Sequence, residues 1–159
     1  MATMKISIVN GSGEGATELS AFDSALMDAG IANLNLIYLS SVIPPGTIID
    51  FVKPSFNKKD FGSRLYVVIS EMRTAVPNKA LWVGVGWVQD IDTKKGLFVE
   101  HHSDTEKGLK SEITKSLNHM TSSRKGDNWG DIKMVTNGVV CNKKPVSVMV
   151  AAIYQLQNW

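Results

Sequence analysis

Seven of the eight residues from Val146 to Ile153 are apolar, and Ser147 is the exception. The segment is short and rich in valine, which favours a strand over a helix. A half-exposed strand alternates between apolar and polar residues, but here both alternating sets are apolar. Segment 145–154 is therefore predicted to be a strand that is buried on both faces.

The other periodic segments predict an α+β domain with more strands than helices. Short β-branched or alternating runs predict strands at 5–9, 35–42, 65–69, 81–88, 97–101 and 131–136. The helical spacing of apolar residues predicts two helices, at 17–29 and 105–120. Their buried stripes would be Leu19, Phe22, Leu26 and Ala29 in the first helix and Leu109, Ile113, Leu117 and Met120 in the second. The glycine-rich segment 10–15 is predicted to be a turn, because its glycine spacing does not match a dinucleotide-binding loop.

Composition restricts the class of protein. The 159 residues fit one domain, 1–159, and 43% hydrophobic with 20% charged residues is typical of a globular chain. The net charge is only +2 and no basic stripe with interleaved aromatic residues occurs, so we expect no nucleic-acid partner. No apolar run approaches the roughly 20 residues that span a bilayer, and no signal peptide is recognisable, so we expect no membrane partner. The single cysteine, Cys141, permits a reducing cytosol, and we expect a cytoplasmic protein.

Two adjacent serines, Ser40 and Ser41, end the second predicted strand just before a double-proline turn. The ordinary interpretation is a strand end with turn-forming serines. A chemical interpretation is also available, because a serine hydroxyl can attack the carbonyl group of the residue before it. The peptide bond then becomes an ester, and elimination breaks the chain and leaves a dehydroalanine that hydrolyses to a pyruvoyl group. This chemistry needs a strained or tightly held backbone and a donor for the oxyanion.

The residues around the serine pair favour the chemical interpretation. Segment 21–46 closely resembles the pyruvoyl-dependent arginine decarboxylases, with an acidic residue on the helix, an Asn-Leu-Ile strand and then Ser-Ser-Val-Ile-Pro-Pro. The resemblance extends to Gly96-Leu97-Phe98-Val99-Glu100, where that family has an essential glutamate on a later strand. The order of strands and helices is also similar over nearly the whole chain, whereas segments 49–63 and 121–142 match no motif that we can name.

The resemblance implies a fold, an assembly and a cofactor. The fold would be a four-layer αββα sandwich, self-cleaved into a β chain (residues 1–40) and an α chain (residues 41–159). The cleaved protomers would form a homotrimer with active sites between neighbouring subunits. The cofactor would be a covalent pyruvoyl group derived from Ser41, with no metal and no pyridoxal phosphate.

The same resemblance gives each candidate site residue its role. Ser41 would become the pyruvoyl group, and Ser40 would become the new C-terminus of the short chain. Asn35 would steady a carbonyl oxygen, Glu100 would supply a proton to the carbanion, and Asp23 would bind the substrate guanidinium. Since Glu100 lies in an apolar strand, we expect burial to raise its pKa. Without the resemblance, Asn35 would bond local backbone, and Glu100 and Asp23 would be solvated carboxylates.

The implied reaction is the decarboxylation of L-arginine, a small-molecule substrate, to agmatine and CO2. Two alternatives stay open: a pyruvoyl decarboxylase for another amino acid such as histidine, and an uncleaved, non-catalytic homologue. Glu100-His101-His102 resembles a metal cluster, but neighbouring strand residues point to opposite faces. The sequence therefore predicts no metal site.

Overall fold

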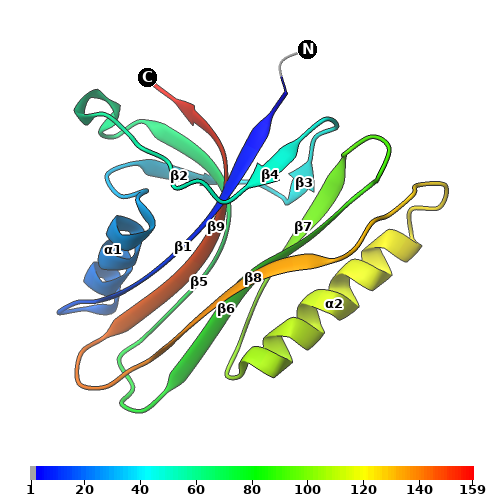
Figure 1. The fold of residues 1–159 in the computed structure, drawn as a ribbon. Coiled ribbons are helices and arrows are strands. Elements are labelled where there is room, and N and C mark those ends of the chain that lie inside the picture. Colours follow the sequence, from blue (N-terminus) through cyan, green and yellow to red (C-terminus); the bar gives the residue numbers. More distant parts are fainter. Residues whose placement is uncertain (1–2) are drawn as a thin grey trace.

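The structure is a computed structural model that describes residues 3–159. Two β-sheets pack face to face, and one helix covers the outer face of each sheet (Figure 1). The first sheet has the strand order β2-β5-β9-β1-β4, and the second has the order β3-β7-β6-β8. The fold is α+β, as predicted, and it is consistent with the αββα sandwich that the resemblance implied.

The first sheet is built from β1 (Lys5–Glu14), β2 (Asn35–Tyr38), β4 (Ile48–Asp50), β5 (Arg64–Thr74) and β9 (Val146–Gln157). The second sheet is built from β3 (Val42–Ile43), β6 (Ala80–Gln89), β7 (Gly96–Ser103) and β8 (Lys133–Val140). The helices are α1 (Glu18–Ala29) and α2 (Glu106–Ser122), and a short 3-10 helix, η1 (Lys58–Asp60), lies between β4 and β5. β1 pairs with β4, and β2 with β5, in parallel, whereas the other strand pairs are antiparallel.

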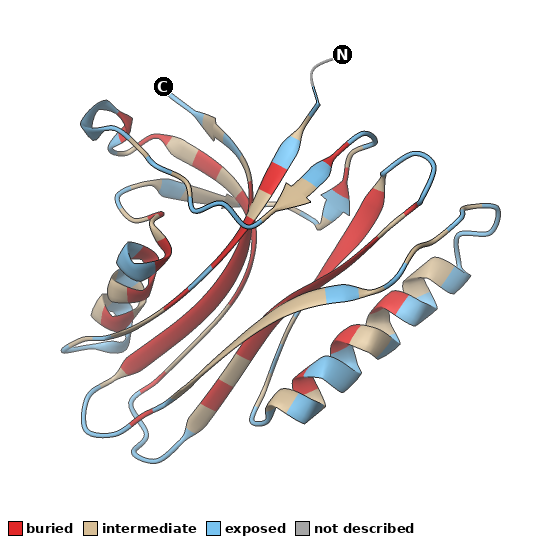
Figure 2. Cartoon of the chain, in the orientation of Figure 1, coloured by how far each residue is buried: buried red, intermediate tan, exposed pale blue. Residues whose placement is uncertain are grey.

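The predicted strand with two buried faces is β9, in the middle of the first sheet. Every residue from Val146 to Ile153 is buried (Figure 2). Its valines and Ala152 pack between the two sheets, and Met149, Ala151 and Ile153 pack on the side of α1. The prediction from the apolar run is confirmed, because the strand separates two hydrophobic cores.

Both helices lie where the sequence predicted them. The buried stripe of α2 is confirmed for Leu109, Ile113 and Leu117, which are fully buried, whereas Met120 is partly buried and packs against the same cluster. The predicted stripe of α1 was partly wrong: Leu19 is 68% exposed, and Ala21 and Ala25 are buried instead. None of the helices in residues 3–159 is long and apolar enough to cross a membrane.

The glycine-rich segment 10–15 is not the predicted turn, because β1 continues through it to Glu14. These glycines let α1 lie directly on the strand. A Cβ atom at Gly13 would lie 2.5 Å from the Cβ of Ser24, and one at Gly11 would overlap the backbone of Ala25. The small residues of α1 and β1 therefore allow a close helix–strand contact that the loop interpretation missed.

The predicted strand 35–42 is also corrected, because it divides into β2 in the first sheet and β3 in the second. The break falls on Leu39, Ser40 and Ser41. The other predicted strands are present with longer or shifted bounds. The chain thus passes from one sheet to the other at the serine pair.

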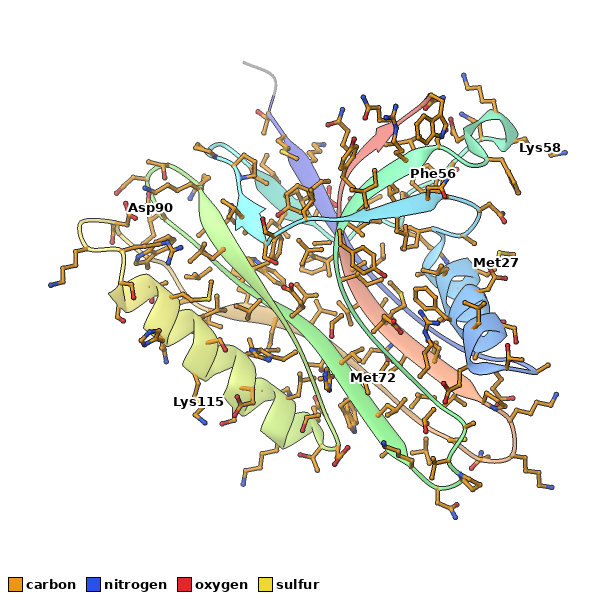
Figure 3. The ribbon with its side chains drawn as sticks, turned by 180° about the vertical axis from the view of Figure 1, so that it is seen from behind. Met27, Phe56, Lys58, Met72, Asp90 and Lys115 are labelled. Carbon is orange, nitrogen blue, oxygen red and sulfur yellow. The ribbon has the colours of Figure 1, made fainter. Side chains whose placement is uncertain are left out.

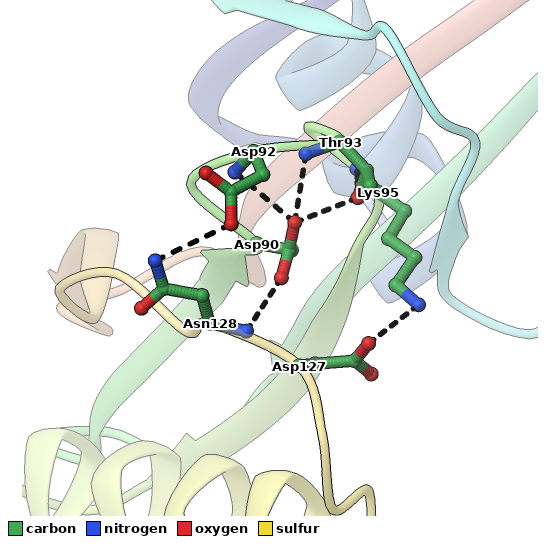
Figure 4. Close-up of polar contacts among 6 residues, drawn as sticks. All are labelled: Asp90, Asp92, Thr93, Lys95, Asp127 and Asn128. Carbon is green, nitrogen blue, oxygen red and sulfur yellow. Dashed lines mark hydrogen bonds and ion pairs between the residues drawn. The ribbon is translucent and has the colours of Figure 1, made fainter.

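A buried carboxylate, Asp90, fixes the turn that leads into β7 (Figure 4). It accepts hydrogen bonds from the Thr93 amide (2.7 Å) and hydroxyl (2.8 Å). It also accepts hydrogen bonds from the amides of Asn128 (2.6 Å) and Asp92 (3.1 Å). These donors, the Thr93 amide first, lower the pKa of Asp90 to about 2, against the opposing effect of burial. The turn therefore sets where Gly96 begins β7, and β7 holds β3.

Replacing Asp90 with asparagine is expected to lower the melting temperature at pH 7, because an amide cannot accept all four hydrogen bonds. The pKa of Asp90 in the folded chain is about 2, below its ordinary value of 3.8. The carboxylate therefore stabilises the fold fully at pH values above 3.8. That contribution is lost as the pH falls through about 2. The difference in melting temperature between Asp90→Asn and the parent should therefore shrink over this acidic range. Asp92→Asn is the matched control, and an unchanged difference at every pH would contradict the role.

Candidate active site

The serine pair lies on the segment that crosses between the two sheets. On one side, the Leu39 amide donates to the Val67 carbonyl of β5 (2.9 Å). On the other side, the Phe98 amide of β7 donates to the Ser41 carbonyl (2.9 Å). Ser41 has a φ of 72°, in the left-handed region that residues with a Cβ atom rarely adopt. This conformation costs about 1–2 kcal/mol, so the peptide that the chemistry would break is both strained and held at its ends.

The side chains of Ser41 and Glu100 are in contact where the chain passes from one sheet to the other. The Ser41 hydroxyl donates to the Glu100 carboxylate, with its Oγ 2.8 Å from one oxygen and 3.0 Å from the other. The pairing of β3 with the start of β7 produces this contact, since it brings Val42 opposite Leu97 and Ser41 next to Phe98. A hydroxyl in contact with a carboxylate is the arrangement of a nucleophile and its base.

Glu100 is exposed, although the sequence led us to expect burial. It lies on the same side of β7 as Phe98, because strand residues two apart share a face. Phe98 is fully buried between the sheets, but the first sheet does not extend far enough to bury Glu100 as well. The expected burial is therefore wrong for the single chain.

Two other predicted site residues lie away from this pair. Asn35 begins β2, and its side-chain amide donates to the Gly62 carbonyl (2.6 Å). Asp23 is an exposed residue of α1, which packs on the outer face of the first sheet. In residues 3–159, neither side chain has a hydrogen bond or ion pair with Ser41 or Glu100. The structure thus unites two of the predicted residues within the chain and leaves Asn35 and Asp23 apart.

A tyrosine that the sequence analysis missed completes the surroundings of the pair. The Tyr154 hydroxyl donates to the Val42 carbonyl (2.7 Å), and the ring packs edge-on against Phe98 with centroids 6.1 Å apart. Burial first, and the negative charge of Glu100 second, raise the pKa of Tyr154 well above its ordinary value. The available signal was weak: a tyrosine follows directly on the apolar run, where a side chain with a polar tip is common.

A surface hollow that could hold a small molecule lies elsewhere. It has a volume of about 540 Å³ and is lined near one end of α1 by Met27, Phe56 and Lys58 among others (Figure 3). None of the five predicted site residues lines it. The Ser41–Glu100 pair instead lies at the surface of the chain, where Ser41 is half-buried and Glu100 is exposed.

Of the two histidines that follow Glu100, His101 contacts the helix α2 and His102 is exposed. His101 Nε2 lies 2.7 Å from the Ser116 hydroxyl of α2, so this ring bridges the second sheet and its helix. Among residues 3–159 no three His, Cys, Asp or Glu side chains gather as metal ligands would.

Comparisons with known proteins bear on the family of this chain. The family model described as pyruvoyl-dependent arginine decarboxylase matches residues 5–158. A protein of that name from Thermoplasma volcanium is 34% identical over 125 residues, which are 77% of this chain and 69% of the relative. One from Pyrococcus furiosus is 28% identical over 88% of this chain and 87% of its own length. One from Halobacterium salinarum is 39% identical over 64% of this chain, and the match spans only 62% of that relative.

Proposed function

The chain belongs to the pyruvoyl-dependent arginine decarboxylase family, whose members are carboxy-lyases with a covalent pyruvoyl group, and from this premise we propose its activity. It is a cytoplasmic homotrimer that cleaves itself between Ser40 and Ser41 and then converts L-arginine to agmatine and CO2. The observation that carries this proposal is the contact between the Ser41 hydroxyl and the Glu100 carboxylate, at 2.8 and 3.0 Å.

Self-cleavage begins when the Glu100 carboxylate accepts the proton of the Ser41 hydroxyl. The freed Oγ attacks the carbonyl carbon of Ser40, a C–O ester bond replaces the C–N bond of the peptide, and the released Ser41 amine takes up the proton held by Glu100. Removal of the α proton of Ser41 expels the Ser40 carboxylate and leaves a dehydroalanine. Addition of water and loss of ammonia then give the pyruvoyl group. The positive φ of Ser41 favours the first step, because breaking the peptide releases the strain.

The residues around Ser41 fit such a group at the start of the long chain. The Phe98 amide donates to the Ser41 carbonyl and would hold the same oxygen after cleavage. The pyruvoyl group, when present, supplies the acceptor for the electrons left by departing CO2. The adjacent Glu100 side chain can hold a proton at either carboxyl oxygen and deliver it to the substrate α carbon.

A second copy of the chain completes the site in our proposal. Among the described residues of one protomer, Asp23 and Asn35 make no hydrogen bond or ion pair with Ser41 or Glu100. Tyr38 and Val42, which flank the serine pair, are each 60% exposed, and apolar surface of this kind is typical of an interface. A neighbouring subunit that covers this surface would bring its own Asp23 or Asn35 to the reacting group and would exclude water from Glu100.

The first test is the mass of the purified chain under denaturing conditions, followed by product analysis with L-arginine and L-histidine. Two chains divided after Ser40, with agmatine formed from arginine alone, are expected. Cleavage with decarboxylation of histidine would overturn the substrate assignment only. One intact chain after prolonged incubation of folded protein would overturn self-cleavage and leave the non-catalytic alternative.

Replacing Asp23 with asparagine is expected to raise the KM for arginine roughly 10- to 100-fold, because a charged hydrogen bond contributes about 1.5–3 kcal/mol. Steady-state kinetics on the cleaved enzyme measure this, and kcat should change little. Glu18→Gln removes another exposed carboxylate of α1 and is the matched control. An unchanged KM in Asp23→Asn would show that Asp23 does not bind the guanidinium.

The same variant tests whether Asp23 acts across an interface. Trimers that mix Asp23→Asn with Ser41→Ala chains contain sites with the reactive group of one chain and the intact Asp23 of its neighbour. Such mixed trimers should recover sites with a low KM. If each site used Asp23 of its own chain, no low-KM activity would return.

A further inference from the structure

β3 is a strand of only two residues at the edge of the second sheet, and it carries Ser41 directly before it. β7 pairs with one side of β3, where the Phe98 amide holds the Ser41 carbonyl. Successive carbonyls of a strand point in opposite directions, so the Val42 carbonyl points away from β7. At a free sheet edge this oxygen would have no strand to bond with.

The hydroxyl of Tyr154 supplies the hydrogen-bond donor that a neighbouring strand would otherwise supply. It comes from β9 of the first sheet and donates to the Val42 carbonyl at 2.7 Å. The Tyr154 ring also packs against Phe98, whose backbone amide bonds the Ser41 carbonyl. Two consecutive carbonyls, those of Ser41 and Val42, are therefore held from opposite sides, and Tyr154 contributes to both.

We propose that Tyr154 is a positioning residue for Ser41, through its hydrogen bond to Val42 and its packing on Phe98. The inference rests on the proposed function, since it assigns a role in that chemistry. Its hydroxyl holds the reacting segment at the angle at which the Ser41 Oγ faces Glu100, and it keeps the same segment in place when cleavage turns it into a chain end. After cleavage this anchoring matters more, because the covalent link to β2 is gone.

The protonation state of Tyr154 suits this role. Burial and the negative charge of Glu100 raise its pKa, so the hydroxyl remains a donor over the whole neutral and mildly alkaline range. A neutral hydroxyl also adds no second negative charge beside Glu100. The hydrogen bond to Val42 therefore persists without placing a second charge next to the Glu100 carboxylate.

The test compares Tyr154→Phe with Tyr66→Phe in the full-length chain. Tyr66 is a matched control, because its hydroxyl also makes one hydrogen bond of 2.7 Å, but to Gln157 at the end of β9 and not to the segment of Ser41. Each substitution removes one oxygen and keeps the ring. The rate of self-cleavage is followed by denaturing mass analysis from freshly made precursor, together with the melting temperature and, after cleavage, kcat and KM for arginine.

Tyr154→Phe is expected to cleave about tenfold more slowly than the parent, the effect of one hydrogen bond of about 1.4 kcal/mol. Its kcat should fall with an unchanged KM, while Tyr66→Phe should match the parent in cleavage. Equal cleavage rates in all three chains would overturn the positioning role. So would parallel losses of melting temperature and cleavage rate in both variants, which would indicate general destabilisation. A parent chain that itself stays intact would instead overturn the proposed function.

Discussion

Replacing Ser41 with alanine is expected to leave a single uncut chain of 159 residues with no decarboxylase activity. Alanine lacks the hydroxyl that contacts Glu100 at 2.8 and 3.0 Å, so neither the ester nor the later pyruvoyl group can form. Denaturing mass analysis measures the cut, and agmatine production measures the activity. This is the largest effect that any substitution should have, because it removes the precursor of the cofactor itself.

The loss of cleavage and activity in Ser41→Ala is expected to come from the missing hydroxyl and not from a folding defect. Alanine and serine both carry a Cβ atom, so the left-handed φ of 72° strains both to a similar extent. The melting temperature of Ser41→Ala should therefore stay near that of the uncut parent. Ser55→Ala, at an exposed serine in another loop, is the control and should be cut normally. Cleavage of Ser41→Ala after residue 40 would show that a different nucleophile breaks the chain.

The elements that depend on local pattern were predictable from the sequence. β9 was predicted because both of its faces are apolar, and α2 because its leucine and isoleucine stripe has a helical period. The glycines of β1 were mistaken for a turn, because sequence shows a missing side chain but not the helix that occupies its space. Long-range packing decides such positions, and local propensity does not contain it.

The division of segment 35–42 could not be predicted for a related reason. Its apolar residues fit one continuous strand, and nothing local marks Ser41 as a residue with positive φ. The conformation follows from pairing with two partners in different sheets, β5 for residues 35–38 and β7 for residues 42–43. The strain at the serine pair is thus a property of the assembled sandwich.

The candidate site, like the fold, was only partly predictable from the sequence. Resemblance to a family pointed to Ser41 and Glu100, and the structure places their side chains in contact. Tyr154 carries no motif, and only the packing of β9 against the second sheet reveals its contact with Val42. The expected burial of Glu100 was wrong because apolar neighbours in sequence cover a strand only where a second layer extends over it.

Replacing Glu100 with glutamine is expected to slow self-cleavage by about 10²- to 10⁴-fold, the usual contribution of a positioned acid or base. The glutamine oxygen can still accept a hydrogen bond from Ser41, so the geometry should persist while the basic group is lost. In the fraction of chains that do become cut, kcat for arginine should fall by a similar factor, because the same side chain supplies the proton after CO2 departs. Denaturing mass analysis and single-turnover kinetics separate the two effects.

Glu14→Gln, at an exposed glutamate beyond contact with the serine pair, is the matched control and should leave both rates unchanged. The two effects of Glu100→Gln need not occur together, and their separation is informative. Slow cleavage with normal turnover would mean that Glu100 acts only in forming the pyruvoyl group. Another residue, from the same or a neighbouring subunit, would then have to supply the proton to the substrate α carbon. Normal cleavage with slow turnover would mean that the strain at Ser41 and the hold of Phe98 and Tyr154 suffice to break the chain without a base. Only a loss in both steps supports one carboxylate that first accepts a proton from Ser41 and later returns one to the substrate.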